Sequence, residues 1–214
     1  MSKIVQKNRR YFLYSSLNSE LKPIYFKQIF NYLRTLVFEY YGFERWYQGL
    51  FCSDYRMQEG RDIIICEEDW MIAGISIIKN LNDEKKICTL RVAKEYQHQG
   101  IGHHLVEMSF KELQTEKPMI TLHKRKLNQF EHLLQYYDFE LEQTQKNYYK
   151  IFSTELVFNG SLPRKQSIID RLLIFDMEKA IYQYLYGEKS MNYNAYMQEY
   201  LKKWIRNDGI EVGI

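Results

Sequence analysis

The most informative part of the chain is residues 90–105, which read Leu90-Arg91-Val92-Ala93-Lys94-Glu95-Tyr96-Gln97-His98-Gln99-Gly100-Ile101-Gly102-His103-His104-Leu105. An apolar strand ends in this stretch, the chain turns through polar residues, and an amphipathic helix begins. Such a turn aims several backbone N–H groups at one point, next to the partial positive charge of a helix N-terminus. Gly100 and Gly102 suit a pyrophosphate there, because a Cβ would block either the phosphate or the required dihedral angles.

The pattern around this stretch predicts alternating strands and helices. Before it we expect a short strand, two helices and three strands, at residues 11–13, 24–40, 40–51, 62–66, 70–78 and 86–92. After it we expect a helix from Ile101, a strand, a second helix and two last strands, at residues 119–122, 127–137, 139–141 and 148–158. This order predicts an α/β (α+β) fold, in which an antiparallel meander passes into a βαβ unit and helices flank the sheet.

The chain divides at the turn-rich residues Asn159-Gly160-Ser161. We expect one domain over residues 1–159 and a C-terminal helical extension over residues 160–214. The extension carries an apolar stripe with helical spacing, from Tyr193 to Ile205. Such a stripe either docks on the first domain or forms a homodimer or partner interface.

Composition excludes several classes of protein. Apolar residues make up 45% and charged residues 27% of the 214 residues, which is typical of a globular protein. The formal net charge of +3 is too small to indicate a nucleic-acid partner. No apolar run is long enough to cross a membrane, and the three cysteines, without a C-x-x-C pair, indicate small core residues in a reducing cytoplasm.

Two motifs resemble one known family. Gln97-His98-Gln99-Gly100-Ile101-Gly102 matches Q/R-x-x-G-x-G/A, through which the GNAT (GCN5-related N-acetyltransferase) superfamily binds coenzyme A. Residues 133–139, Leu-Leu-Gln-Tyr-Tyr-Asp-Phe, are similar to its F-Y-E-K-L-G-F segment. The resemblance extends over roughly residues 10–158 in element order, and it implies a mixed, mainly antiparallel sheet and an acyltransferase that uses acetyl-CoA.

The resemblance also implies where the cofactor binds. The main chain at Leu90 and Val92 would pair with the pantetheine arm like an added strand. The pyrophosphate would lie on the turn formed by Gln97, His98, Gln99, Gly100, Ile101, Gly102 and His103.

The catalytic positions depart from the family pattern. The tyrosine that often serves as general acid falls on Leu134. On a helix, Tyr137 lies nearly one turn further on, so it is a better substitute than Tyr136, although both also fit a packing role. His123, at the end of a strand beside the expected thioester, is a second candidate acid or base.

Other charged groups give weaker signals. Glu67 and Glu68 border the hairpin, where they either activate an amine through water or form a solvated acidic turn with Asp69. The five histidines cluster between positions 98 and 132, but they lack the spacing of metal ligands. The run Lys124-Arg125-Lys126 either contacts the 3′-phosphate of the cofactor or begins a helix in solvent.

Two functions therefore compete. The first is a cytoplasmic N-acetyltransferase that moves an acetyl or similar group directly to the amine of a small molecule or peptide. The fold also serves charged tRNA, which would be the exception to the exclusion of nucleic acid. The second is a non-catalytic acyl-CoA sensor or scaffold that binds a partner through its C-terminal helices, as the missing tyrosine would favour.

Overall fold

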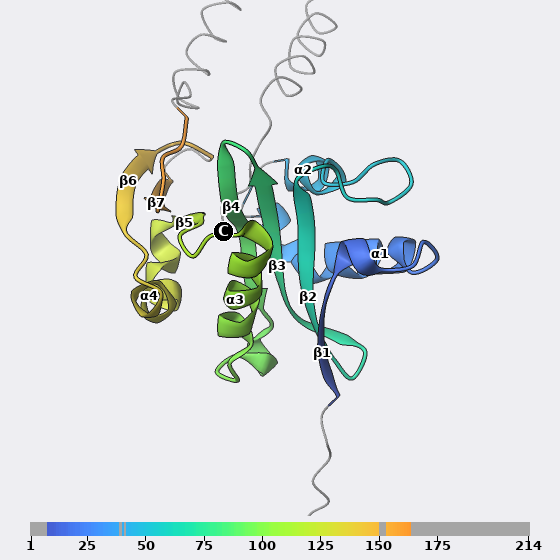
Figure 1. Ribbon diagram of the computed structural model, residues 1–214. Helices are drawn as coiled ribbons and strands as arrows, with labels where there is room; N and C mark the ends of the chain where they lie inside the picture. The colour runs from blue at the N-terminus through green and yellow to red at the C-terminus, as the bar shows by residue number, and fades with distance from the viewer. Residues whose placement is uncertain (1–7, 39, 41, 150–152, 164–214) are drawn as a thin grey trace, which may run out of the picture.

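The computed structural model describes residues 8–38, 40, 42–149 and 153–163, and it places their strands in one sheet (Figure 1). The strand order is β1-β2-β3-β4-β5-β7-β6. The strands are β1 (Arg9–Leu13), β2 (Arg61–Glu68), β3 (Met71–Leu81), β4 (Glu84–Val92), β5 (Met119–His123), β6 (Leu141–Lys146) and β7 (Thr154–Phe158). Within the described residues every neighbouring pair is antiparallel except β4 with β5.

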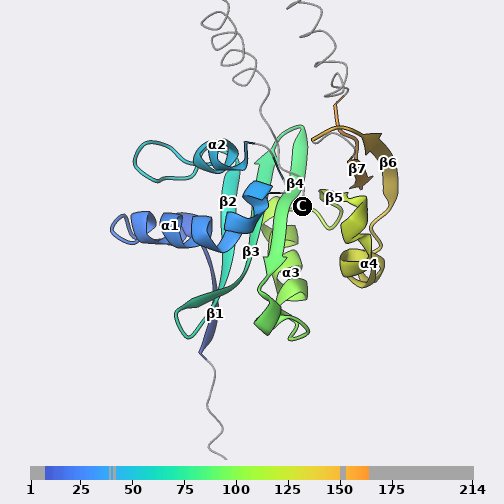
Figure 2. The same ribbon diagram turned by 180° about the vertical axis from the view of Figure 1, so that it is seen from behind.

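Helices cover both faces of this sheet. The α-helices are α1 (Lys22–Leu33), α2 (Phe43–Gln48), α3 (Ile101–Leu113) and α4 (Leu127–Tyr136). The short 3-10 helices are η1 (Tyr14–Ser16), η2 (Arg34–Phe38), η3 (Lys94–Tyr96) and η4 (Lys124–Lys126). Figures 1 and 2 show α1 and α2 on one face and α3 on the other.

Each face has its own hydrophobic core, because alternate residues of a strand point to opposite sides. One cluster joins α1 and α2 to residues such as Ile63, Ile75 and Val157. The other cluster joins α3 and α4 to Ile64 and Leu156. These two residues adjoin Ile63 and Val157 in the chain and so point to the opposite face of the sheet.

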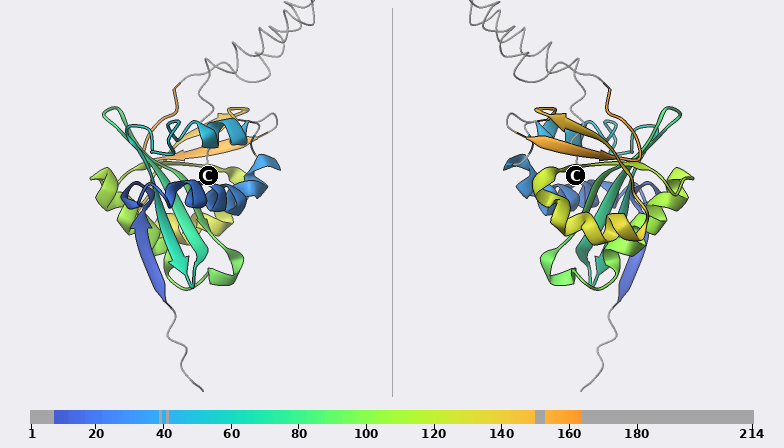
Figure 3. Two further views of the ribbon diagram at one scale, coloured as in Figure 1. Left: turned by 90° about the vertical axis from the view of Figure 1, so that its right-hand side faces the viewer. Right: turned by 90° about the vertical axis from the view of Figure 1, so that its left-hand side faces the viewer.

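The sheet diverges between β4 and β5. The two strands pair only at Lys86 with Met119 and at Ile87 with Ile120. Beyond Ile87, no described strand lies against this edge of β4, and β5, β6 and β7 stand apart from the first four strands (Figures 1 and 2). The side views show how strongly β6 and β7 are rotated relative to β1 and β2 (Figure 3), in line with sheet twist.

The expected mixed, mainly antiparallel sheet flanked by helices is confirmed, with three local corrections. The last two strands, expected at 139–141 and 148–158, are β6 over Leu141–Lys146 and β7 over Thr154–Phe158. Glu67 and Glu68 do not form a solvated turn: they end β2 as buried side chains, and the turn falls at Asp69 and Trp70, both with positive φ. Cys66 and Cys88 are buried as expected, but Cys52 is exposed.

Of the C-terminal helical extension expected over 160–214, the structure describes residues 160–163, which are not helical. The rest, with the stripe from Tyr193 to Ile205, lies outside the described residues. In the part of the chain that is described, no helix has the length and apolar character needed to cross a membrane.

Candidate cofactor and acceptor site

A cavity of about 1030 Å³ opens where β4 and β5 diverge. The end of β4, the following turn, the first residues of α3 and the near side of α4 all border it. Its lining includes Thr89, Leu90, Arg91, Val92, Gln97, His98, Gly100, Ile101, Gly102, His103, Lys126, His132 and Leu133. Its volume is at the upper end of the range of ligand sites in proteins, about 300–1,000 Å³.

The turn between β4 and α3 is shaped for an anion. His98 and Gly100 have positive φ values of 59° and 79°, which lets the chain reverse just before α3 begins at Ile101. The first backbone N–H groups of a helix have no partner within the helix. No acidic residue lies in the first turn of α3, so nothing there opposes a bound phosphate.

Gly102 leaves space on the cavity side of α3. A Cβ at this position would meet only Leu133 Cδ1 at 3.8 Å and Val92 Cγ2 at 3.9 Å, both ordinary contacts. Packing of the protein therefore does not require glycine here. The absent side chain instead keeps the helix backbone open to whatever enters the cavity.

Side chains brace the turn from both ends. The Gln97 amide donates a hydrogen bond to the Val92 carbonyl oxygen at 3.2 Å. On the other side, Arg9 Nη2 donates to Gln99 Oε1 at 2.7 Å, while Arg9 Nε donates to Glu68 at 2.7 Å. The turn is thus held to β4 and, through Arg9, to β1.

The structure brings together the cofactor-site residues that the sequence suggests, except one. Leu90, Val92, Gln97, His98, Gly100, Ile101, Gly102 and His103 all line the cavity. Gln99 does not line it, because its side chain points to Arg9 and to the Glu95 carbonyl oxygen.

The two suggested proton-transfer residues lie outside the lining. The Tyr137 hydroxyl lies 3.1 Å from Glu107 Oε1 and 3.3 Å from the His103 carbonyl oxygen. Burial, together with the nearby Glu107 carboxylate, raises the pKa of Tyr137. His123 ends β5, and its Nδ1 accepts a hydrogen bond from the Arg125 backbone N–H at 3.0 Å. Leu134, at the usual tyrosine position, is buried.

Sequence reasoning missed a buried polar group near the diverging strands. Glu155 on β7 is 1% exposed, and burial raises its pKa to about 7. Thr89 and Thr121 are also buried, and their hydroxyls have no hydrogen-bond partner among the described residues. A carboxylate inside the apolar run 154–158 was the one sequence signal for this group.

Glu67 and Glu68 do not enter the cavity. Arg10 Nε donates to Glu67 Oε1 at 2.8 Å, and the Tyr25 hydroxyl donates to the other oxygen. Glu68 is paired with Arg9. Both carboxylates are thus engaged in pairs between β1 and β2.

Comparison with protein-family models identifies one family. The family model described as an acetyltransferase (GNAT) domain matches residues 37–147, just over half of the chain. No curated protein has significant sequence similarity to the chain.

Several solved structures are similar. The ribosomal-protein-S18-alanine N-acetyltransferase of Escherichia coli is 15% identical over 74% of this chain and 100% of its own, with a TM-score of 0.49. A probable acetyltransferase of Staphylococcus epidermidis is 17% identical over 70% of this chain and 96% of its own, with a TM-score of 0.47. A Bacillus subtilis acetyltransferase in complex with CoA is 14% identical over 72% and 99%, with a TM-score of 0.46.

Proposed function

The chain belongs to the GNAT acetyltransferases, and from that premise we propose that it moves an acetyl group from acetyl-CoA to an amine by direct transfer. One observation carries the proposal. The unpaired edge of β4 and the N-terminus of α3 border the same cavity. An extended amide chain and an anionic group could therefore be held side by side by backbone groups alone.

The residues present fit acetyl-CoA in two ways. Among the described residues no strand pairs with Leu90 or Val92 on the side where β5 has diverged. The backbone groups of Leu90 and the Val92 N–H are therefore available to the amides of the pantetheine arm, while the Val92 carbonyl already accepts from Gln97. The turn from Gln97 to His103 offers N–H groups to the pyrophosphate, and Gly102 adds no side chain in between.

Direct transfer needs little beyond correct positioning. Acetyl-CoA supplies an activated thioester, which a neutral amine attacks at the carbonyl carbon. Backbone N–H groups at the edge of β4 would stabilise the negative charge that develops on the carbonyl oxygen. Holding the two reactants in this geometry provides much of the rate, so strong acid or base groups are not essential.

For the proton that the leaving thiolate requires, we propose His123 ahead of Tyr137. His123 is the last residue of β5, the strand that diverges from β4. The Tyr137 hydroxyl is engaged by Glu107 and His103 of α3, which favours a role in packing α4 on α3.

The acceptor is tested directly. The protein is incubated with acetyl-CoA and a library of small-molecule amines and peptides with free N-termini or lysines, and mass spectrometry is used to find products heavier by one acetyl group. We expect acetylated amines at a rate well above that of a control without protein. Tight binding of acetyl-CoA without transfer to any acceptor would favour the sensor instead, a function that the buried Leu134 at the usual tyrosine position supports.

A further inference from the structure

Buried polar atoms without partners gather beside the cavity. Among the described residues, no hydrogen bond of good geometry reaches the hydroxyl of Thr89 or of Thr121, or either carboxylate oxygen of Glu155. Their exposed fractions are 3%, 0% and 1%. The Ser153 hydroxyl still lies close enough to the Glu155 carboxylate to favour its charged form. Buried polar groups in proteins are nearly always hydrogen-bonded, so a cluster of such atoms indicates a site that is incomplete without a polar ligand.

The register of the strands places these residues together. In the antiparallel pair of β5 and β7, Glu155 lies opposite His123, and Val157 lies opposite Thr121. Directly opposed residues point to the same face, as do residues two apart on one strand. Val157 packs in the core with α1 and α2, so Glu155, Thr121 and His123 project on that face of the sheet.

Thr89 reaches the same region from the other side of the divergence. It lies on β4 two residues beyond Ile87, where the pairing with β5 ends, and it lines the cavity. Lys126, which also lines the cavity, is one of the charges that act on Glu155. Lys126 therefore links the cavity to the buried Glu155 carboxylate, which does not itself line the cavity.

The charged and titratable groups around Glu155 come from several elements. They are Lys86 on β4, Lys126 in η4 and His123 opposite on β5. The neutral Ser153 hydroxyl, just before β7, also favours the carboxylate form. On β6 the opposing residue is the neutral Gln145. Burial outweighs the two lysines and Ser153, and the pKa of Glu155 rises to about 7.

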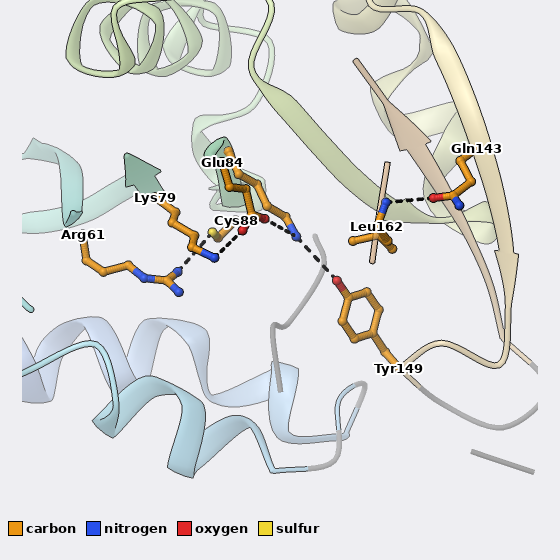
Figure 4. A network of polar contacts seen from close by, with 8 residues as sticks. Arg61, Lys79, Glu84, Cys88, Gln143, Tyr149 and Leu162 are labelled. Carbon is orange, nitrogen blue, oxygen red and sulfur yellow. Dashed lines mark hydrogen bonds and ion pairs between the residues drawn. The ribbon is translucent and has the colours of Figure 1, made fainter. Parts of the chain in front are cut away.

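Lys86 has other partners. Its ammonium lies 3.5 Å from the Tyr149 hydroxyl and 3.9 Å from Glu84 Oε1. Figure 4 shows Glu84 and Tyr149 in this network of polar contacts. The positive charge of Lys86 is therefore compensated by Glu84 as well as by Glu155.

We propose that Glu155 is the base that takes a proton from the ammonium group of the acceptor, and that Thr89 and Thr121 hydrogen-bond that acceptor. The inference rests on the proposed function and names the substrate class at its site, a primary amine that arrives protonated. A base is most effective when its pKa lies near the working pH, and Glu155 meets that condition. The cluster is also buried, so the proton passes between groups shielded from bulk water.

The steps balance as follows. The Glu155 carboxylate takes one proton from the ammonium, which leaves a neutral amine with a free lone pair. The nitrogen attacks the thioester carbonyl carbon, the C–N bond forms, and the C–S bond breaks. His123 gives a proton to the thiolate sulfur and takes up the second nitrogen proton in its place, and Glu155 returns its proton to solvent.

The test compares the wild type with Glu155→Gln, Glu155→Asp and the control Glu142→Gln, which changes an exposed glutamate on the neighbouring strand β6. Release of coenzyme A from acetyl-CoA is followed with a thiol reagent between pH 5.5 and 9, using glycinamide, n-butylamine, spermidine or water as acceptor. We expect kcat/KM of the wild type to rise through pH 7. In Glu155→Gln the rise of kcat/KM with pH should disappear, and the rate should fall about 100-fold, within the usual range for general bases. Glu155→Asp should recover part of the lost rate.

Affinity for acetyl-CoA, measured by calorimetry, separates this role from a structural one. It should stay within about twofold of the wild type in every variant, because Glu155 does not line the cofactor turn. If the wild type turns over and Glu155→Gln keeps the same rate and pH profile, the assignment of Glu155 as the base is wrong, but the transfer function stands. No release of coenzyme A by the wild type under any condition, despite tight binding, would overturn the transfer function and this inference with it.

Discussion

The hydroxyl of Tyr32 on α1 donates a hydrogen bond to the main-chain carbonyl of Arg91 at 3.2 Å. The Arg91 guanidinium lies over the Tyr32 ring, 5.5 Å from its centroid, and Arg91 Nη1 donates to Thr35 Oγ1 at 2.7 Å. These contacts tie α1 and η2 to the end of β4. They fix the backbone at the edge that we propose to pair with the cofactor, so α1 supports the site without lining it.

Replacing Tyr32 by Phe should weaken acetyl-CoA binding. The loss of one hydrogen bond costs about 1 kcal/mol, which corresponds to a roughly fivefold higher Kd in calorimetry. Tyr47→Phe is the matched control, since the Tyr47 hydroxyl donates to the Phe26 carbonyl at 2.7 Å, away from the cavity. That variant should lose stability but keep its affinity, and equal Kd values for all three proteins would show that α1 does not position β4.

Charge at position 100 tests the pyrophosphate site. A Cβ on Gly100 would meet nothing within 4 Å, and only its φ of 79° disfavours a side chain. Gly100→Ala therefore introduces backbone strain but no steric clash and no charge, and its Kd for acetyl-CoA should change by a few-fold at most. Gly100→Glu adds a carboxylate at the N-terminus of α3 and should raise Kd at least ~10-fold further, since like charges repel there. Equal affinities of the two variants would place the phosphates elsewhere.

How much the sequence predicts depends on the range of the interactions involved. The turn at Gln97 to Gly102 and the start of α3 follow from local chemistry, namely glycines, polar residues and helical periodicity, and they appear where expected. The burial of Glu67 could not be seen in the same way, because its partner Arg10 lies 57 positions earlier. The importance of Glu155 likewise depends on β7 being placed beside β5.

The pair between Glu67 and Arg10 should contribute to stability. Glu67 is buried and accepts hydrogen bonds from Arg10 and Tyr25, so Glu67→Gln should lower the free energy of unfolding by about 2–4 kcal/mol. Urea denaturation at pH 7 measures the change. Asp54→Asn removes a carboxylate from the exposed pair with Arg56 and should leave the midpoint unaltered, as is usual for surface pairs. Equal midpoints for wild type and Glu67→Gln would mean that the pairing of the buried Glu67 with the half-exposed Arg10 gives no net stabilisation.

The source of the thiolate's proton can be assigned with two substitutions. His123→Asn keeps an acceptor for the Arg125 N–H but removes the imidazole, so we expect turnover to fall about 10- to 100-fold. Tyr137→Phe loses contacts to Glu107 and His103, so it should lower the melting temperature and change turnover by less than about 10-fold. Acetyl-CoA affinity should be unchanged in both variants. The reverse order of rates would make Tyr137 the proton donor.

The raised pKa of Glu155 should also appear in stability. The pKa is about 7 in the folded protein against a reference value of 4.5, so folding favours the protonated carboxyl. Its stabilising effect is complete below pH 4.5 and is lost as pH rises to about 7. A shift of this size corresponds to a loss on the order of 3 kcal/mol.

Glu155→Gln removes that loss, because the amide stays neutral at every pH. Measured by urea denaturation from pH 4.5 to 8.5, the unfolding free energy of the variant relative to wild type should increase up to about pH 7 and then stay constant. The variant should therefore be the more stable protein at pH 8, although it is the poorer enzyme, as expected for a base held in an unfavourable environment. A wild type more stable than the variant at pH 8 would instead identify Glu155 as a structural counter-ion of Lys86 and Lys126, and would contradict its assignment as the base.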